Sequence, residues 1–246
     1  MNSNQKTFIP ALFLHIQKTA GSSVVHAASQ HYAGSITSHG DCWGRNPDSL
    51  KNIGFISGHV GYDFCRSLLP NRFSFTFLRD PIERVISMYY FCRAQDPTLY
   101  EIYERANTLD FKSFLRAAFN DQWIKKNIWN NQVWQLAHGY AHQDNRTISD
   151  FHEEELLDLA KRHLEEISYI GFTETFSKDC QAIFSQLQIS LFDGIPKTNV
   201  SPGRPLLCNL SEDDIDIAKS LTSLDQLLYD YAWDKFSKIR QINSVL

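Results

Sequence analysis

The chain has 246 residues, of which 43% are hydrophobic and 21% charged, a composition that excludes a disordered or low-complexity protein. Its 24 lysines and arginines face 28 aspartates and glutamates, and the formal net charge of −4 argues against a nucleic-acid binder or a surface built for a long polyanion. An anionic ligand must therefore be met by a few well-placed cations.

The chain shows no internal repeat or Pro/Ser-rich linker, so we expect a single domain that spans residues 1–246. No segment reaches the length of a membrane span, and the apolar run near the N-terminus is too short for a signal peptide. Five cysteines are dispersed without a C-x-x-C pair, which indicates free thiols in a reducing compartment. These features predict a cytoplasmic protein.

The first predicted elements are a strand and a helix joined by a polar turn. Residues 11–16 are apolar except for His15, the pattern of a strand buried on both faces. Residues 22–32 are expected to be helical, with Ser22 or Ser23 as the cap. A second strand is expected at 53–59, and the alternation of phenylalanine with serine and threonine predicts a third at 72–80.

Asp80 and Pro81 follow that strand, an arrangement that favours Asp80 as the N-cap of a helix that runs to about Arg93. Apolar residues at spacings of three and four predict another helix around 157–167. A strand at 169–172, a helix at 176–187 and a loop at 194–209 come next. Ser211 with Asp214 resembles a capping box, after which we expect mostly helix.

Strands that alternate with helices predict the α/β class, with a mostly parallel central sheet flanked by helices and a helical C-terminal part. Ligands of such sheets bind beyond the carboxyl ends of the strands. Three polar turns, after the strands at 11–16, 53–59 and 72–80, fall at those ends. We therefore expect the functional site there.

The turn at 17–23, Gln-Lys-Thr-Ala-Gly-Ser-Ser, has the composition of a phosphate or sulfate cradle. A strand-to-helix turn presents free N–H groups at the positive end of the helix dipole. Gly21 allows close backbone approach, the hydroxyl groups add donors and Lys18 adds a full charge. The alternative is an exposed lysine beside a capped helix. The lysine precedes the glycine, unlike a Walker A loop, which makes ATP hydrolysis less favoured.

Two segments resemble motifs of sulfotransferases that use 3′-phosphoadenosine 5′-phosphosulfate (PAPS). "HIQKTAGSS" is similar to their 5′-phosphosulfate loop, and "FLRDPIERVISMYYFCR" to their 3′-phosphate motif, in the same order along the chain. The second is closest to the carbohydrate branch that includes the uronosyl 2-O-sulfotransferases. The resemblance implies a P-loop-like fold, PAPS as cofactor, no required metal and, here, a soluble bacterial form.

The resemblance also implies which residues bind the cofactor. Arg79 and Ser87 would hold the 3′-phosphate, and a guanidinium fork with a hydroxyl suits a phosphate dianion. Arg84 has a structural alternative, an ion pair with a neighbouring carboxylate on its helix. The adjacent aromatic residues Tyr89, Tyr90 and Phe91 are expected to pack in the core. The 5′ side would be bound by the turn itself, through Lys18, Thr19, Ala20, Gly21, Ser22 and Ser23.

Sulfuryl transfer to an alcohol needs a cation beside the leaving oxygen and a general base for the hydroxyl proton. Lys18 is the candidate cation. His59, which follows a strand and lies between glycines, is the candidate base, although a lone histidine is more often structural. The same Gly-His-Val sequence carries the catalytic histidine in the 2-O-sulfotransferase branch. Ser57 stands where that branch has a second histidine.

The other histidines are interpreted as structural or idle. His15 lies in the first strand and is expected to be a hydrogen-bonded structural residue. His39 with Cys42 has ligand-like spacing, but one H-x-x-C is weak support for zinc. His138 and His142 lie four apart in what looks like a loop, where a metal site is not expected.

A late loop, "TNVSPGRP" at 198–205, resembles the segment with which these enzymes close over the nucleotide. It adds Asn199, Ser201 and Arg204 as candidate cofactor residues, and Thr173 at a strand end is a further candidate. Asn199 also opens a formal glycosylation sequon, whose glycan would block the site.

The resemblance is faint between 96 and 150, where acceptor specificity is expected. "NIWNNQVWQLAHG" at 127–139 is either a sugar-binding segment or a helix that packs Trp129 and Val133 inward.

We predict a sulfotransferase that acts on a hydroxyl of a carbohydrate, glycolipid or small molecule, without nucleic-acid partners. The excess of acidic over basic residues predicts that long sulfated chains are poor acceptors. Two alternatives stay open: an ATP- and Mg²⁺-dependent kinase or NTPase, and a non-catalytic module that binds PAP or PAPS.

Overall fold

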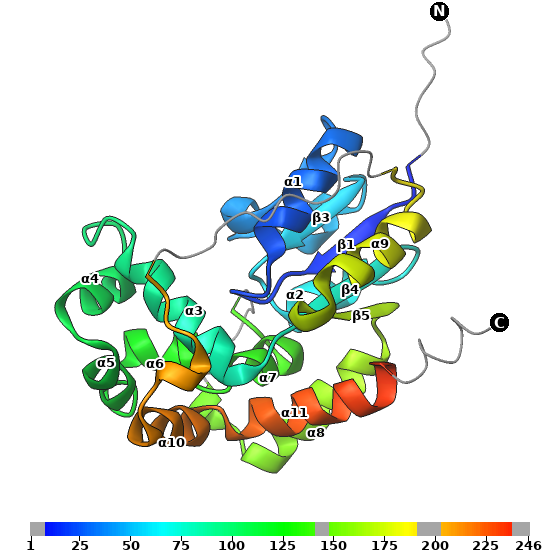
Figure 1. Ribbon diagram of the computed structural model, residues 1–246. Helices are drawn as coiled ribbons and strands as arrows, with labels where there is room; N and C mark the ends of the chain where they lie inside the picture. Colours follow the sequence, from blue (N-terminus) through cyan, green and yellow to red (C-terminus); the bar gives the residue numbers. More distant parts are fainter. Residues whose placement is uncertain (1–7, 141–147, 191–202, 238–246) are drawn as a thin grey trace, which may run out of the picture.

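The structure, a computed structural model, describes residues 8–140, 148–190 and 203–237 (Figure 1). Five strands form one sheet in the order β2-β3-β1-β4-β5, and all four strand pairs are parallel. The α/β class with a parallel sheet is therefore confirmed. The strands are β1 (Ala11–Leu14), β2 (Ile36–Thr37), β3 (Phe55–Gly58), β4 (Phe73–Leu78) and β5 (Tyr169–Phe172).

The two faces of the sheet are covered by different helices, because neighbouring side chains of a strand point to opposite sides. Phe13 belongs to a core with α1 (Gly21–His31) and α9 (Phe176–Gln186). Leu12 and Leu14 belong to the core on the other face. That face is covered by α2 (Tyr62–Cys65), α7 (Asn131–Ala137), α8 (Glu153–Glu165) and α11 (Ser223–Ala232).

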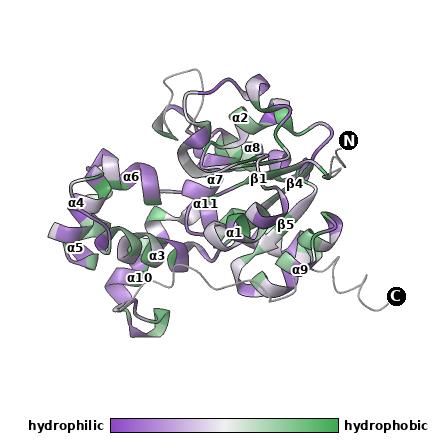
Figure 2. Cartoon of the chain, turned by 90° about the horizontal axis from the view of Figure 1, so that it is seen from above, coloured by the Kyte–Doolittle hydropathy of each residue, from purple (hydrophilic) through white to green (hydrophobic). Residues whose placement is uncertain are grey.

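A second group of helices extends from the sheet and has its own apolar core around Phe114. Figure 2 shows this helical group gathered on the side of the sheet away from α9. The group consists of α3 (Pro81–Arg93), α4 (Glu101–Thr108), α5 (Phe111–Ala117), α6 (Gln122–Ile128) and α10 (Glu212–Leu221).

Most local predictions agree with the structure, and one is wrong. The Asp80 carboxylate accepts a hydrogen bond from the Glu83 backbone N–H at 2.9 Å, so the predicted cap of α3 is confirmed. Ser211 caps α10 by accepting from the Asp214 N–H at 3.2 Å. Neither Ser22 nor Ser23 caps α1: the helix already starts at Gly21, and its N-cap residue Ala20 has no side chain that could cap it.

The five cysteines are free thiols, four of them buried, while location in the cytoplasm stays a prediction. Within the described ranges, no helix combines the length and the apolar character that crossing a membrane requires. The same residues contain no cluster of three or more histidine, cysteine, aspartate or glutamate side chains arranged to hold a metal ion.

Candidate active site

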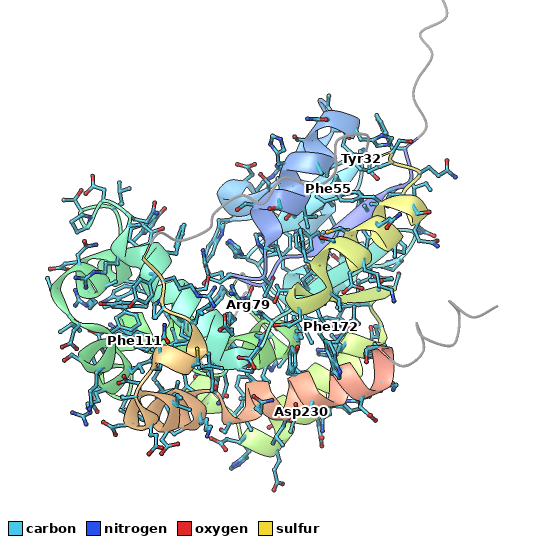
Figure 3. The ribbon with its side chains drawn as sticks, in the orientation of Figure 1. Tyr32, Phe55, Arg79, Phe111, Phe172 and Asp230 are labelled. Atoms are coloured by element: carbon cyan, nitrogen blue, oxygen red, sulfur yellow. The ribbon has the colours of Figure 1, made fainter. Side chains whose placement is uncertain are left out.

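A cavity of about 1240 Å³ opens at the carboxyl ends of the strands, between the sheet and the helical group. In Figure 3 Arg79 lies between the sheet and the helical group. The turn after β1, the turn after β3 and the start of α3 all contribute to its wall, as expected for a parallel sheet. Ten of the predicted site residues line it: Lys18, Ala20, Gly21, Ser22, Ser23, His59, Arg79, Ser87, Thr173 and Arg204.

The turn between β1 and α1 has an unusual backbone. Lys18 and Ala20 both adopt left-handed conformations, with φ of 66° and 67°, and Thr19 between them does not. The Thr19 hydroxyl is buried and donates to the Ile16 carbonyl at 2.8 Å, and this hydrogen bond stabilises the turn. Left-handed residues in a turn of this kind help neighbouring backbone N–H groups to converge on an anion. Strain of this kind is typical of ligand-binding loops.

Glycine is required at position 21 because the His15 ring leaves no room for a side chain there, and not because of the dihedral angles of Gly21. A Cβ atom at position 21 would lie 1.8 Å from His15 Nε2. The His15 ring is held between the rings of Phe13 and His59, at centroid distances of 4.9 and 4.2 Å. His15 is therefore a buried structural residue that sets the distance between the lysine turn and His59.

His59 is oriented by the backbone of β1. Its Nδ1 lies 2.9 Å from the His15 carbonyl oxygen. Because a carbonyl oxygen can only accept, Nδ1 carries the hydrogen of the neutral ring, and Nε2 is then the basic nitrogen. The turn that follows is fixed against the end of α7, since Gly61 and Gly139 pack backbone to backbone. A Cβ on Gly61 would lie 2.2 Å from the Gly139 Cα.

The Lys18 ammonium is buried without a carboxylate among its principal electrostatic partners. Burial above all, together with the nearby guanidinium groups of Arg79 and Arg204, lowers the pKa of Lys18 to about 8, while Cys92 opposes the shift. Its Nζ lies 3.7 Å from the centroid of the Phe91 ring, so Phe91 does more than pack. Three cations thus gather at one end of the cavity, where an anion would be stabilised.

Arg79 connects its own motif to the Lys18 turn through a hydrogen bond. Its Nη1 donates to the Lys18 carbonyl at 3.1 Å. The backbone N–H of Arg79 donates to Gln132 Oε1 at 3.0 Å, and Gln132 Nε2 donates to the Arg79 carbonyl at 2.9 Å. Gln132 comes from α7 and is 1% exposed. The side chain of one buried glutamine therefore fixes the backbone at Arg79.

Glu83 lies between two arginines of the site. Its carboxylate pairs with Arg79 at 3.3 Å and, closely, with Arg204. Burial and the neighbouring Arg79 lower the pKa of Arg204 to about 10. The Arg204 Nε is buried with no hydrogen-bond partner among the described residues. These guanidinium donors fit a further anion such as a phosphate.

The remaining candidates occupy different positions around the cavity. Ser87 is 5% exposed and lies on the cavity wall. Thr19 is fully buried and is not part of the wall formed by described residues. The Thr173 hydroxyl donates to Glu174 at 3.1 Å. Asn199 and Ser201 lie outside the described residues.

Arg84 is a structural residue. It is completely buried and donates to the carbonyls of Asn127 and Ile128 at 3.1 and 3.3 Å. The i,i+4 ion pair at this place in the chain joins Arg79, which precedes α3, to Glu83 in the first turn of the helix. The sequence contained that signal, because Glu83 stands four residues after Arg79. It contained no local signal for Gln132, which lies 53 residues from its partner.

The segment 127–139 favours the packing alternative over most of its length. Every residue of α7 is buried. Asn130 and Asp225 cap each other's helices: Asn130 accepts from the Leu224 N–H at 3.0 Å, and Asp225 accepts from the Val133 N–H at 2.8 Å. Just before α7, Asn127 lines the cavity together with Trp123 and Lys126 of α6. His138 pairs with Asp63 at 2.9 Å.

Comparison with known proteins places these features in a family. The profile of the sulfotransferase family matches residues 7–232. Heparan-sulfate 6-O-sulfotransferase 2 of Gallus gallus is 26% identical over 68% of this chain and 44% of its own length. Heparan-sulfate 6-O-sulfotransferase 1-B of Danio rerio is 26% identical over 70% of this chain and 45% of its own. The chain thus spans less than half the length of these relatives.

The fold also has a counterpart among solved structures. A sulfotransferase from Alicyclobacillus acidocaldarius superposes with a TM-score of 0.51 at 13% identity, covering 89% of this chain and 96% of that one. At this identity the similarity concerns the fold, and it agrees with the predicted P-loop-like arrangement.

Proposed function

The chain belongs to the sulfotransferase family, and from this membership we propose that it transfers a sulfuryl group from PAPS to a hydroxyl group of a carbohydrate. The observation that carries the proposal is the meeting of the two cofactor motifs in one cavity. The Lys18 turn and Arg79 are joined by a hydrogen bond of 3.1 Å, and His59 lies on the same wall. A nucleotide with phosphate groups at both ends suits two cationic groups held this way.

We assign the cofactor contacts to the chain's own donors. The Lys18 turn would bind the 5′ side through its N–H groups, Ser22 and Ser23. Arg79, Ser87 and Arg204 would bind the 3′-phosphate, which requires Glu83 to share its two arginines with the ligand. Thr173 would contact the base of the nucleotide, and Asn199 and Ser201 stay predictions of the sequence.

In the proposed reaction the cofactor supplies a sulfuryl group, whose bond to the bridging oxygen breaks as a bond to the acceptor oxygen forms. Lys18 stabilises the negative charge that develops on the departing oxygen. His59 takes the acceptor's hydroxyl proton at Nε2, because its Nδ1 hydrogen is engaged by the His15 carbonyl. None of these roles calls on a metal ion, so we propose that activity survives treatment with EDTA.

The acceptor class rests on two independent similarities. The relatives found by comparison are named for sulfation of heparan sulfate, and the motif around Arg79 resembles the uronosyl 2-O-sulfotransferases. Both groups act on sugar hydroxyls, and we propose a carbohydrate acceptor on that basis.

The test combines transfer and binding. Purified protein with ³⁵S-labelled PAPS should label a glycan acceptor, and PAP should bind more tightly than ATP with Mg²⁺ in parallel calorimetric titrations. The His59→Ala variant should bind PAP normally and lose about 10²- to 10⁴-fold in transfer. His26→Ala, an exposed histidine on α1, is the control and should be unaffected.

Three results would point elsewhere. Preference for ATP with Mg²⁺ would favour a kinase or NTPase. Tight PAP binding without transfer to any acceptor would favour a binding module. Full activity in His59→Ala would remove His59 as the base.

A further inference from the structure

Some side chains on the cavity wall differ in chemical character from Lys18, Arg79 and Arg204. Two of the largest exposed aromatic side chains, Trp43 at 50% and Tyr100 at 61% exposure, line the cavity. Trp43 follows the turn His39–Cys42 on the sheet side, and Tyr100 precedes α4 in the helical group. Large aromatic rings that stay exposed on a cavity wall cost solvation free energy and mark a binding surface.

The other charges on the cavity wall balance. Apart from the cofactor residues and Glu83, the charged side chains on the described part of the wall are Glu101, Lys126 and the histidines. Lys126 is already engaged, since its Nζ lies 3.7 Å from the centroid of the Trp123 ring. A polyanionic chain needs several free cations along its path. One lysine with a glutamate nearby does not supply them.

One buried polar atom on the cavity wall has no hydrogen-bond donor among the described residues. Gln17 Oε1 is buried and has no hydrogen-bond partner among the described residues, and Gln17 lines the cavity beside Lys18. An amide oxygen can only accept. Sulfate and ionised carboxylate groups also only accept, so they would not satisfy it, whereas a sugar hydroxyl would.

We propose that Gln17, Trp43 and Tyr100 belong to an acceptor site for a neutral sugar, presented as a small glycoside or as the uncharged end of a glycan. The rings of Trp43 and Tyr100 pack against the apolar C–H face of the sugar, and Gln17 Oε1 accepts a hydrogen bond from one of its hydroxyls. The inference rests on the proposed sulfotransferase function and narrows it, because it separates this chain's acceptor from sulfated heparan-type polymers.

The first experiment compares acceptors and variants in transfer from labelled PAPS. Methyl lactoside should be sulfated with a higher kcat/KM than heparan-type chains. Trp43→Ala and Tyr100→Ala should each raise the KM for methyl lactoside about three- to tenfold with little change in kcat or PAP affinity. Phe119→Ala is the matched control, since Phe119 is 46% exposed and is not part of the cavity wall.

The second experiment does not depend on turnover. Titration of the protein with methyl lactoside, with and without PAP, should change its tryptophan fluorescence. Trp43→Phe should remove most of that change, and Trp233→Phe, at an exposed tryptophan that stacks on Tyr229, should keep it.

The outcomes separate the two claims. A fluorescence change that depends on Trp43, in a protein that neither binds PAP nor transfers sulfate, would support the sugar site and contradict the sulfotransferase. Better transfer to heparan-type chains than to methyl lactoside would overturn the neutral-sugar inference and keep the enzyme. The neutral-sugar inference also fails if Trp43→Ala and Tyr100→Ala leave the KM unchanged, or if methyl lactoside leaves the fluorescence of the intact protein unchanged.

Discussion

The cationic and the aromatic part of the cavity wall are built in opposite ways. In the cationic part the residues are partly buried, and hydrogen bonds hold His59 to the His15 carbonyl and Arg79 to Gln132 and the Lys18 carbonyl. In the aromatic part Trp43 and Tyr100 are largely exposed and come from short segments outside the sheet. The first part is held in a single geometry by hydrogen bonds, and the second offers exposed aromatic surface.

The difference shows which part of such a site must be rigid. Stabilising a developing charge requires donors that are already in place, because reorganisation during the reaction would weaken them. Holding a sugar through ring contacts tolerates small displacements, since dispersion contacts are numerous and individually weak. Changes in the cationic part should therefore reduce kcat steeply, and changes in the aromatic part should act mainly on KM.

The largest effect is expected for Lys18→Met, which keeps the length of the side chain and removes its charge. Transfer should fall about 10²- to 10³-fold in kcat with the fold intact. The control is Lys125→Met, because Lys125 also lies over an aromatic ring, that of Trp129 at 3.5 Å, but outside the cavity wall. Comparable losses in both variants would show that the loss does not come from the cavity.

The lowered pKa of Lys18 gives this prediction a pH dependence. Burial holds the pKa at about 8, so the ammonium loses its proton as the pH rises through that value and its attraction for an anion disappears. PAP affinity, followed by titration calorimetry between pH 7 and 9.5, should decline above pH 8 in the native protein and in Lys125→Met. Lys18→Met should show a flatter profile.

Gly21→Ala should have the next largest effect, because the added methyl group meets the His15 ring, which is held between Phe13 and His59. We expect a loss of about 1–3 kcal/mol in stability and about ten- to hundredfold in kcat as His59 moves. Gly40→Ala is the control for stability and kcat, since a Cβ there meets one neighbouring atom, Trp43 Cδ1, at the ordinary contact distance of 3.9 Å. Equal thermal unfolding and equal kcat in the two variants would contradict the assignment.

Gln132→Leu should weaken PAP binding about tenfold, because it leaves the N–H and carbonyl of Arg79 without their partners. Gln135→Leu provides a control on the same buried helix, since the Gln135 amide bonds Asn131 at 2.9 Å and does not contact Arg79. Titration calorimetry with PAP measures both. If the two variants bind alike, Gln132 does not position Arg79.

The smallest effect on PAP binding is expected for Asp225, which supports α7 and through it Gln132. Burial raises the pKa of Asp225 from 3.8 to about 6, against the opposing charge of Arg84. The folded state therefore holds this proton more tightly than the unfolded chain. The resulting stabilisation is fully present below about pH 4 and is lost as the pH rises through 6.

Asp225→Asn removes this titration. The unfolding free energy of the native protein minus that of the variant should fall by about 2–3 kcal/mol from pH 4 to pH 7, measured by urea denaturation. Parallel pH curves for the two proteins would show that Asp225 does not titrate in this range. PAP affinity at pH 7 should change less than in Gln132→Leu.

The sheet and the cationic part of the cavity wall could be predicted because their signals are local. Apolar runs gave the positions of β1, β3, β4 and β5, and Asp80 with Pro81 gave the start of α3. Lys18 and Arg79 stood directly after predicted strands, and parallel strands bring their carboxyl ends to one edge. The capping of α1 was predicted wrongly, since the helix starts at Gly21, before the expected serine.

The rest depends on contacts between distant parts of the chain. Gln132 lies 53 residues from Arg79, and Asn130 lies 94 residues from Leu224, so their neighbours in the sequence do not reveal these roles. The helices α4, α5 and α6 have only seven or eight residues each, too short to show a clear apolar period. That Trp43 and Tyr100 line the same cavity therefore became visible through the fold alone.

The contact between Gly61 and Gly139 has a consequence for altering this protein. It joins the turn of His59 to the end of α7 at a point where no side chain fits on either segment of the chain. Position 43 and position 100 lie elsewhere in the sequence, so a library that varies them can reshape acceptor choice while this junction holds the base still. A grafted loop that replaces residue 61 or residue 139 must keep glycine at both positions, because a side chain at either one would displace His59.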